Sequence, residues 1–512
     1  MGGETRQSGP DVIVVGGGGA GLAAAIAAAE AGAKVLLCEK NPELGGSTAW
    51  SVGSVSATGT PHQLARGIRD TPDEHYDDLE ILAGRYANRD NRELRRLLVD
   101  RTQEMMAWLD SLGIVFVGPN VEPPHRHPRM HNVVPNSRAF PLALGARCRQ
   151  LGVEIRLATR VLSLLTDDDR IAGVEIAGPG GRREPIRARR GVILAAGDYS
   201  ASPELKRRFA GPETADLEPV NATATGDGFG LGTDAGGTVI NGDIVRGPIM
   251  RFVPPTSPSL IGRLPPSRAL GRLMKWSFEH LPAAILRPFA MRFLTTALGP
   301  SAELFRQGAV LVDRGGRRFA DEVAGAAGSV PQRPGGEAFI LFDATVADQF
   351  TAWPYFISTA PGVAYAYLDD YRRTRGDIYH SAPTLDALAT ALGVPGQALA
   401  DSVAAYNAGG RRNPDGAIRP VIARPPFVAL GPVKSYVVFT DGGLKVNTKL
   451  QVLDGSDLPI PGLWAAGSNG QGGVLLEGHG HHLGWAFISG RIAGREAARA
   501  EAAADNGQAQ AA

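Results

Sequence analysis

The sequence predicts an α/β fold built on a doubly wound parallel sheet, and residues 11–40 carry the main evidence. They pass from a β-branched run through a glycine cluster and an alanine-rich helical pattern into a second apolar run. This order is that of a βαβ unit. Gly16, Gly18 and Gly21 fit GxGxxG, whose glycines permit a tight turn, close approach of a pyrophosphate and close helix packing. The following helix offers its N-terminus to an anion.

Two further features favour a dinucleotide site over a glycine-rich turn that binds nothing. Glu39 closes the second apolar run, at the spacing expected for an acidic residue that binds a ribose. The turn Gly45–Thr48, with the sequence GGST, follows directly. GxGxxG alone is a weak signal, but the three features together predict a dinucleotide-binding domain.

Composition narrows the class of protein. Lysine and arginine (53) nearly balance aspartate and glutamate (52), so the formal charge of +1 gives no overall attraction to nucleic acid. The chain has only two cysteines, Cys38 and Cys148, which argues against a disulfide framework or a thiolate zinc site and fits a reducing compartment. We find no signal-peptide pattern and no apolar run of about 18 residues. The expectation is a soluble, cytoplasmic enzyme of several domains.

The motifs of the first 54 residues resemble the flavin-binding half of the fumarate reductase and succinate dehydrogenase flavoprotein superfamily, which includes the 3-ketosteroid dehydrogenases. The resemblance implies a Rossmann-type FAD-binding domain with an inserted α+β substrate cap. Family members with covalent flavin carry a histidine where this chain has Ala49, Trp50 and Ser51, so we expect noncovalent FAD. The implied cofactor-binding residues are Gly16, Gly18, Gly19, Ala20, Gly21, Glu39, Lys40, Gly46, Ser47, Thr48, Gly53, Val161, Asp227, Gly467 and Leu483.

Later motifs extend the resemblance over nearly the whole chain. The segment 225–228 (TGDG) resembles the end of the family's first flavin segment, 318–322 (RFADE) its cap motif near the active site, and 459–473 its C-terminal strand and turn. They imply an FAD-binding domain in two parts, 1–236 and 363–500, a cap over 237–362 and a flexible tail over 501–512.

The residues that family fumarate reductases use on a dicarboxylate are exchanged. Ala326 replaces the proton-donating arginine, Phe439 a histidine and His482 the arginine that grips a carboxylate. The chain therefore resembles the branch that desaturates ketones, including 3-ketosteroids, more than the fumarate reductases, although the steroid 1-dehydrogenase motif is absent. In that branch the flavin takes a hydride from the β carbon while a base, often tyrosine, removes the α proton.

The candidate bases are Tyr436, just before the turn TDGG, and Tyr365 or Tyr367 in an aromatic stretch. Tyr436 ranks first because the turn faces flavin in relatives. Asp441 is an alternative acid or base, although a turn-forming aspartate explains it equally well. Packing is the competing interpretation for each tyrosine.

Three histidines stand close together in the stretch EGHGHHLGW, residues 477–485. Metal ligands should share one face with cysteine or carboxylate partners, whereas His481 and His482 are adjacent in a glycine-rich turn, so we expect no metal. By resemblance this turn leads into a helix that points at the flavin. We expect His482 to contact substrate or flavin, with His479 as a second candidate.

Segment 263–292 departs from the family pattern, with six basic residues and one acid among large apolar residues. It predicts either an amphipathic surface helix pair or a segment that contacts lipid or admits an apolar substrate.

The sequence thus predicts an FAD-dependent dehydrogenase of a cyclic ketone or related alicyclic substrate, with an external electron acceptor. The alternatives are an ene reductase of an unsaturated acid or enone, and a non-catalytic electron-transfer or redox-responsive flavoprotein.

Overall fold

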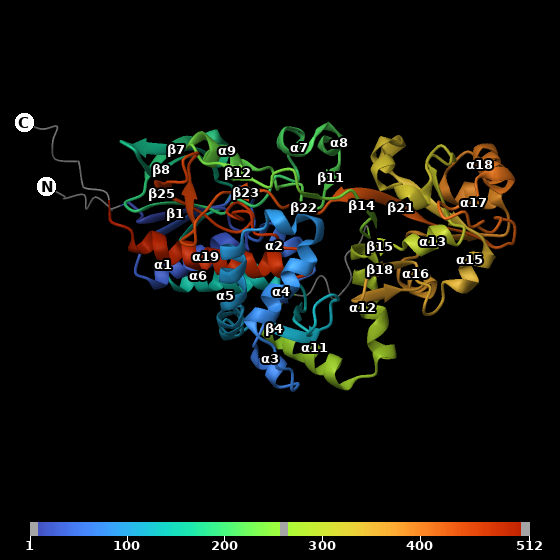
Figure 1. Cartoon of the computed structure of the whole chain (residues 1–512), viewed down its shortest axis with the longest axis horizontal. Coiled ribbons are helices and arrows are strands. Elements are labelled where there is room, and N and C mark those ends of the chain that lie inside the picture. Colours follow the sequence, from blue (N-terminus) through green and yellow to red (C-terminus); the bar gives the residue numbers. More distant parts are fainter. Residues whose placement is uncertain (1–8, 256–264, 503–512) are drawn as a thin grey trace, which may run out of the picture.

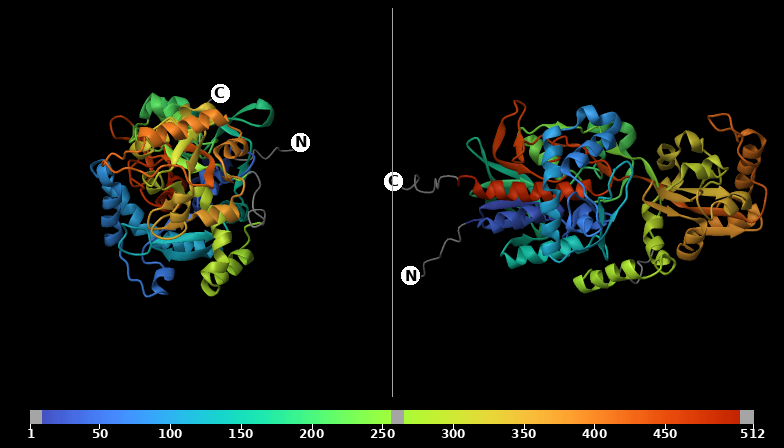
Figure 2. Two further views of the ribbon diagram at one scale, coloured as in Figure 1. Left: turned by 90° about the vertical axis from the view of Figure 1, so that its right-hand side faces the viewer. Right: turned by 60° about the horizontal axis from the view of Figure 1, so that its bottom comes forward.

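The computed structural model describes residues 9–255 and 265–502, which form two lobes along the long axis of the molecule (Figure 1, Figure 2). The first lobe contains both ends of the described chain, and the middle of the sequence forms the second lobe. Arg263 of the predicted basic segment and most of the predicted tail, residues 503–512, lie outside the described residues.

A six-stranded sheet is the centre of the first lobe. Its spatial order is β24 (Gln451–Leu453), β25 (Pro459–Ala465), β10 (Gly191–Leu194), β1 (Val12–Val15), β2 (Val35–Cys38) and β6 (Glu154–Arg156). Neighbours are parallel except β24, which is antiparallel to β25. Every residue of β1, β2 and β10 is buried, as their continuous apolar runs require in a parallel sheet covered on both faces. The predicted α/β fold is confirmed.

Helices cover one face of this sheet and a small antiparallel sheet lies on the other (Figure 1). The helices are α1 (Gly19–Glu30), α6 (Ala139–Gln150) and α19 (His481–Arg499). The small sheet consists of β7 (Arg160–Asp167), β8 (Arg170–Ala177) and β9 (Arg183–Arg187).

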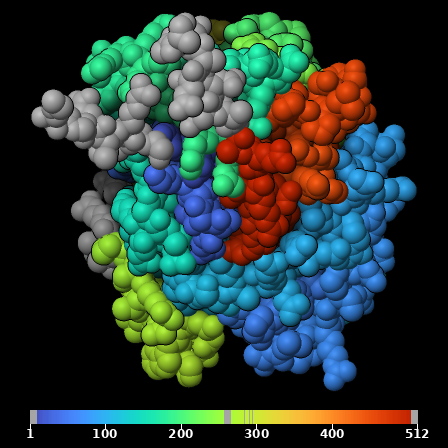
Figure 3. All heavy atoms as spheres, turned by 90° about the vertical axis from the view of Figure 1, so that its left-hand side faces the viewer, coloured from blue at the N-terminus to red at the C-terminus, as the bar shows by residue number. Residues whose placement is uncertain are grey.

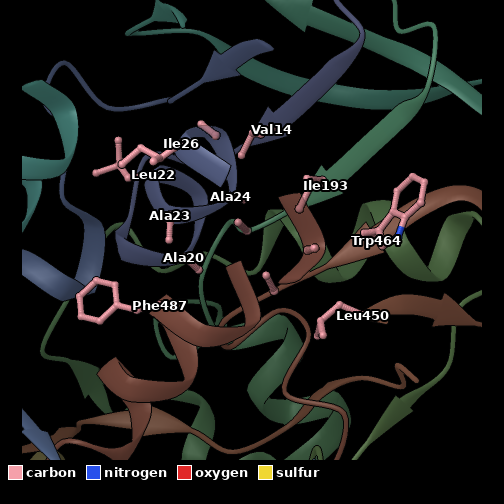
Figure 4. Packing of buried hydrophobic residues seen from close by; sticks show 14 of the residues in the cluster. Val14, Ala20, Leu22, Ala23, Ala24, Ile26, Ile193, Leu450, Trp464 and Phe487 are labelled. Carbon is pink, nitrogen blue, oxygen red and sulfur yellow. The ribbon is translucent and has the colours of Figure 1, made fainter. Parts of the chain in front are cut away.

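Small residues allow α1 and α19 to pack at close range. A Cβ atom added at Gly490 would lie 2.3 Å from the carbonyl oxygen of Ala20, and one at Gly494 would lie 2.2 Å from that of Ala24. Figure 4 shows Ala20 and Ala23 of α1 pointing toward α19, where Phe487 lies. In the end-on view the red C-terminal segment lies among the blue N-terminal segments, so the first and last parts of the chain form one core (Figure 3).

Two helices follow one another in the first lobe. They are α4 (Pro72–Ala83) and α5 (Arg92–Ser111), joined by a 3-10 turn over Gly84–Arg89. The break occurs at Gly84, which caps α4 with a φ of 52°. Beside these helices lies a three-stranded sheet of β3 (Ser54–Ser56), β5 (Met130–Val134) and β4 (Val115–Asn120).

The second lobe is organised around one long strand, β21 (Phe427–Val437). It pairs with β11 (Glu218–Pro219), β14 (Ile249–Phe252), β17 (Ala338–Phe342) and β20 (Tyr379–Ala382), and β16 (Val310–Asp313) flanks β17. A smaller sheet holds β15 (Gly299–Pro300), β18 (Ser358–Ala360) and β19 (Ala364–Ala366). The covering helices include α13 (Ala302–Arg306), α15 (Ala344–Gln349), α16 (Leu368–Thr374), α17 (Leu385–Leu392) and α18 (Gly396–Gly409).

The second lobe extends beyond the cap range expected from the sequence. Residues 378–433 contribute β20, most of β21 and two helices to the sheet and apolar clusters that also contain β16 and β17. The expected boundary at 362/363 therefore falls inside this unit, and we propose that the cap runs from about residue 247 to 437. The cap enters and leaves beside one antiparallel pair, β13 (Val245–Arg246) with β22 (Phe439–Thr440).

The basic segment forms two helices, α11 (Arg268–His280) and α12 (Ala283–Ala297). Pro282 separates them, whereas Pro288 lies inside α12. Gly271 lets α11 approach the β4–β5 sheet, since a Cβ there would lie 2.8 Å from the carbonyl oxygen of Val134. Among the described residues, no helix combines the length and apolar character needed to cross a membrane.

Candidate flavin and active site

A cavity opens at the carboxyl ends of β1, β2 and β10, where a doubly wound sheet binds its ligand. It encloses about 830 Å³, part of which is open to solvent. The predicted cofactor residues that line it are Gly16, Gly18, Gly19, Ala20, Glu39, Lys40, Gly46, Ser47, Thr48, Val161, Asp227 and Gly467. Local motifs far apart in the sequence thus meet around one space.

The glycine turn has the geometry that a pyrophosphate requires. Gly16 has a φ of +106°, and an added Cβ would lie 2.4 Å from the carbonyl oxygen of Ala195. At Gly21 an added Cβ would lie 1.9 Å from the Gly16 carbonyl oxygen, whereas at Gly18 the nearest atom is 3.9 Å away. Gly16 and Gly21 therefore close the turn, and Gly18 leaves its backbone open to a ligand. Helix α1 begins here without a side-chain cap or an acidic residue in its first turn, which suits an anion.

Charged residues surround the rest of the cavity. The buried carboxylate of Glu39 accepts hydrogen bonds from the backbone N–H groups of Gly17 at 2.6 Å and Asn41 at 2.8 Å. Two carboxylate oxygens can accept about four hydrogen bonds, so the side chain retains capacity for ribose hydroxyls. Asp227 lies 3.2 Å from Nζ of Lys40 and 3.0 Å from Nη2 of Arg160.

Three predicted cofactor residues do not line this cavity. Gly21 is enclosed by the turn, as described above. Gly53 packs on the β5 strand, where an added Cβ would lie 2.4 Å from Cγ1 of Val133. Leu483 is buried in the first turn of α19. Direct contact of these three with the cofactor stays a prediction.

The cavity also includes residues that sequence reasoning missed. They are polar or small and come from loops between the motifs: Asn41, Thr159, Arg160, Asn221, Thr223 and Ser468. The position of Asn41 directly after Glu39 and Lys40 was the one available signal. The others join the site only because the sheet brings their loops to its edge.

A second group of side chains lies where the cap strands enter the first lobe. Nε of Arg246 donates to the fully buried Asp441 at 2.6 Å, and Arg246 also pairs with Glu477. Nε2 of His482 lies 3.3 Å from the other oxygen of Asp441, and the His482 ring packs on Phe439 with centroids 4.0 Å apart. We name Arg246, Phe439, Asp441, Glu477 and His482 the polar cluster.

The polar cluster has unusual electrostatics. Burial alone would raise the pKa of Asp441, but His482, Arg246 and Gln471 hold it below its ordinary value, so this carboxyl is ionised. Burial raises the pKa of Glu477, with Arg246 opposing the shift. An imidazole oriented by a buried carboxylate is an arrangement suited to proton transfer. The sequence had singled out His482 and Asp441, but Arg246 and Glu477 carried no signal.

Tyr436 lies on β21, where its register partners are Glu218 on β11 and Ile249 on β14. Burial, with the charges of Glu218 and Glu337, raises its pKa to about 12 although Arg251 acts in the opposite direction. A base acts best with a pKa near the working pH, so this environment favours the protonated phenol.

Tyr365 and Tyr367 lie in the cap. The Tyr365 hydroxyl accepts a hydrogen bond from the Gly362 backbone at 3.1 Å, and its ring packs on Trp353 and Phe356. The guanidinium of Arg287 lies 5.0 Å from the ring centre of Tyr367. These contacts are those of packing residues, and a catalytic role for Tyr365 stays a prediction.

His479, the second histidine candidate, makes a local contact. Its Nδ1 lies 2.5 Å from Oε1 of the buried Glu122, which also accepts from the His479 backbone N–H at 2.8 Å.

The RFADE segment, residues 318–322, lies inside the cap and stabilises it through ion pairs. Arg318 and Arg419 both pair with the buried Glu322, at 2.8 Å and 3.2 Å. Ala326 is buried in the apolar core of the cap.

The fold and the glycine-lined cavity define a dinucleotide-binding oxidoreductase. The family described as "FAD binding domain" matches residues 11–475, and the chain belongs to this family. FAD is therefore its cofactor, and the open backbone at Gly18, the uncapped α1 and the Glu39 carboxylate fit its pyrophosphate and ribose. The resemblance to the fumarate reductase and succinate dehydrogenase superfamily is confirmed.

Several proteins are similar over most of the chain. A fumarate reductase (cytochrome) of Shewanella frigidimarina is 27% identical, over 96% of this chain and 77% of the relative. The 4-oxocyclohex-2-ene-1-carboxylate 5-dehydrogenase of Sinomonas cyclohexanicum is 27% identical, over 70% of this chain and 59% of the relative. The open conformation of a flavocytochrome c3 fumarate reductase superposes with a TM-score of 0.71 at 25% identity, covering 96% of this chain and 79% of that one. The chain is thus an FAD-dependent oxidoreductase.

Proposed function

We propose that this flavoprotein dehydrogenates the carbon–carbon bond next to the carbonyl of an alicyclic ketone. The observation that carries the proposal is the polar cluster, in which His482 lies beside the ionised Asp441 and Arg246 links Asp441 to Glu477. It supplies a proton-transfer group and a partly buried cation, which are what enolate formation needs.

Charge argues against a dicarboxylate substrate. The carboxylates of Asp441 and Glu477 both pair with the single guanidinium of the cluster, that of Arg246. A third carboxylate, Glu122, lies close enough to influence the pKa of Glu477. The arginines of the fumarate reductases are replaced by Ala326 and His482. A dianion would meet more buried negative than positive charge, whereas a ketone would not.

The residues have separate roles in the proposal. His482, oriented by Asp441, removes the α proton, and Arg246 stabilises the negative charge that develops on the carbonyl oxygen. Tyr436, protonated because its pKa is about 12, donates a hydrogen bond to the substrate. Bound FAD would supply the two-electron oxidant for the hydride of the β carbon, and an external acceptor would reoxidise it.

Anaerobic flavin bleaching tests the proposal. The oxidised holoprotein is mixed with saturated cyclic ketones, and the flavin absorption band is followed. Bleaching by a ketone, with formation of the enone, supports dehydrogenation. Succinate serves as the matched control, because the charge argument predicts no bleaching by this dicarboxylate.

An ene reductase is the second candidate, since the same site runs in either direction and the phenol of Tyr436 is suited to donate a proton. The similar fumarate reductase of Shewanella frigidimarina is named for a reaction in the reductive direction. In this case ketones leave the band unchanged, and enones reoxidise the dithionite-reduced protein. If the flavin absorption changes in neither assay, the protein would be an electron-transfer or redox-responsive flavoprotein.

Tyr436→Phe separates the two candidate proton-transfer groups. If His482 is the base, the variant keeps its FAD and slows bleaching without abolishing it, because the phenol only orients the substrate. Complete loss of bleaching with FAD retained would instead restore Tyr436 as the base, as the sequence had suggested.

We also propose that α11 and the start of α12 contact a lipid surface. Leu273, Trp276, Phe278, Leu281 and Ile285 are all exposed there. Basic residues of the same helices, including Arg272 and Lys275, suit anionic headgroups. Cosedimentation with anionic vesicles should be lost in a Trp276→Ser variant and kept in Trp353→Ser, which changes an exposed tryptophan elsewhere in the cap. Equal sedimentation of the two variants would contradict this.

A further inference from the structure

Three buried histidines from distant parts of the chain meet beside the polar cluster. His75 lies on α4, His125 in the loop before β5, and His481 at the first position of α19. The side chains of His75 and His481 are fully buried, and that of His125 is 1% exposed. His481 and His482 are adjacent but point to different partners, His481 to this group and His482 to Asp441.

The three rings form a nearly equilateral triangle. Their centroids are 5.5 Å apart for His75–His125, and 5.3 Å for His75–His481 and for His125–His481. One ring nitrogen of each residue lies within 4.8 Å of those of the other two. Imidazoles bound through nitrogen at about 2 Å to one tetrahedral metal have centroids roughly 5 Å apart, so small movements suffice to bring the nitrogens onto one ion.

Hydrogen bonding leaves ring nitrogens available. Nδ1 of His75 lies 2.8 Å from the hydroxyl of Thr58, and this hydroxyl donates its own proton to Asp70. Nδ1 of His75 is therefore the donor to Thr58, and the lone pair of the ring is on Nε2. This lone pair points at Nε2 of His481, which lies 3.1 Å away. Nδ1 of His481 and Nε2 of His125 are buried without a hydrogen-bond partner among the described residues.

The neighbours of the rings resemble the outer shell of a metal site, in which each ligating histidine is oriented by a carboxylate or carbonyl. Asp70 acts on His75 through Thr58. Asp78 lies 3.7 Å from Nδ1 of His125, and Nη1 of Arg129 lies 2.9 Å from the same nitrogen. A guanidinium only donates, so Nδ1 of His125 accepts this hydrogen bond and its proton is on Nε2. Binding a metal through Nε2 requires Arg129 to turn to its other partners, Asp70 and Asp78, and the ring proton to move to Nδ1, on the side of Asp78.

Charge and protonation state also suit a cation. Burial lowers the pKa of His481 to about 3 and that of His125 to about 4, and it lowers the pKa of His75 well below its ordinary value, so all three rings are neutral at neutral pH. Asp70, Asp78 and Glu122 are buried nearby, and the fully buried Arg129 pairs with Asp70 and Asp78. Oε2 of Glu122 is buried and without a hydrogen-bond partner among the described residues.

We propose that His75, His125 and His481 bind a divalent transition metal, with zinc as the first candidate and the fourth position taken by water. Neutral imidazole ligands suit zinc and its neighbours in the periodic table. The ion would join α4 and the loop before β5 to the first turn of α19, next to His482. The site revises the expectation of no metal, which considered only the local HGHH stretch.

Metal binding by the holoprotein is the direct test. Protein purified without chelator is analysed for metals by mass spectrometry, stripped with chelator, and titrated with Zn²⁺ or Co²⁺. We expect about one ion per chain, and Co²⁺ should give ligand-field absorption at longer wavelength than oxidised flavin. Chelation should lower the unfolding temperature, and Zn²⁺ should restore it.

Variants locate the ion. His125→Asn should weaken Zn²⁺ binding by more than about tenfold. His380→Asn changes a histidine on β20 of the cap, and it should bind like the parent chain. Flavin content reports folding in both. The proposal fails if the parent chain takes up no metal at micromolar Zn²⁺ and Co²⁺, a result that does not depend on folding of the variants. It also fails if His125→Asn binds as tightly as the parent.

Discussion

At the scale of single residues, the electrostatics of the site depend on Asp441. Its two oxygens are shared between Arg246 on one side and His482 and Gln471 on the other. A fully buried, ionised carboxylate with three partners holds each of them in place. Catalytic effects at this site should therefore concentrate on His482.

His482→Gln should lower the rate of substrate-driven flavin reduction by about 10²–10⁴-fold, the usual contribution of a general base. Glutamine retains a polar contact to Asp441 but cannot take up a proton, so FAD content should not change. Stopped-flow absorption at the flavin band measures the rate. His380→Gln, on β20 of the cap, is the control. A rate within a few-fold of the parent would remove His482 from the chemistry.

Because His131 is buried, we expect the stability of the protein to depend on pH. It is fully buried, and burial lowers its pKa from 6.5 to about 4. Between pH 6.5 and pH 4 the unfolded chain binds more protons than the folded chain, so the free energy of unfolding falls as the pH falls below 6.5. By pH 5 this histidine alone lowers the free energy of unfolding by about 2 kcal/mol. Above pH 6.5 it contributes no further change.

Thermal unfolding of the parent chain and His131→Asn at pH 7.5 and pH 5 measures this effect. The variant should lose less stability on acidification than the parent. His280→Asn changes an exposed histidine on α11 and should leave the pH dependence unaltered. Parallel losses in the parent and His131→Asn would contradict the assignment.

At the scale of elements, the contact between α1 and α19 determines the geometry of the flavin site. Helix α1 begins at the glycine turn of this site, and α19 contributes Ala486 to the cavity. Gly480 precedes α19, and its φ of +94° and its approach to Ser56 exclude a side chain. The glycines along α19 fix the separation of the two helices, so their substitution acts on stability and on FAD binding together.

Gly490→Ala should destabilise the chain by about 1–3 kcal/mol, because its Cβ would lie 2.3 Å from a backbone oxygen of α1 and the helices would have to separate. Chemical denaturation measures the change, and fluorescence of released FAD should appear earlier in the transition. Gly230→Ala, on helix α9 (Asp227–Asp234), is the matched control, since nothing lies within 4 Å of its added Cβ. Similar transitions for the two variants would refute the packing argument.

The elements also determine how much could be predicted from sequence. The βαβ unit and its glycines were predictable because the turn, the helix start and the acidic residue lie within 30 positions and follow local rules. The polar cluster as a whole was not, because Arg246 and Asp441 are 195 positions apart and Arg246 belongs to no motif. The histidine triangle is the extreme case, since His75 and His481 are 406 positions apart.

At the scale of the whole molecule, the cap is one insertion whose two ends meet at one place. Arg246 and Phe439 are antiparallel partners, and partners of this kind have Cα atoms about 5 Å apart. A chain in which a short Gly/Ser linker replaces residues 247–438 should therefore still bind FAD, which the first lobe holds. It should lose ketone-driven bleaching, because removal of the cap takes away its contacts to the substrate, including Tyr436 on β21, and opens the site to water. Flavin content and bleaching measure both outcomes, and a folded but flavin-free product would contradict the assignment of domains.

The continuity of β21 with the polar cluster has a consequence for inhibition. This strand is the centre of the cap sheet, and only Val438 separates its end from β22, which is followed directly by Asp441. A turn of the cap is therefore transmitted along the backbone to the carboxylate that orients His482. A compound that binds the cap far from the flavin and changes the orientation of the cap would act as a noncompetitive inhibitor. Resistance to it would arise by substitutions remote from the flavin.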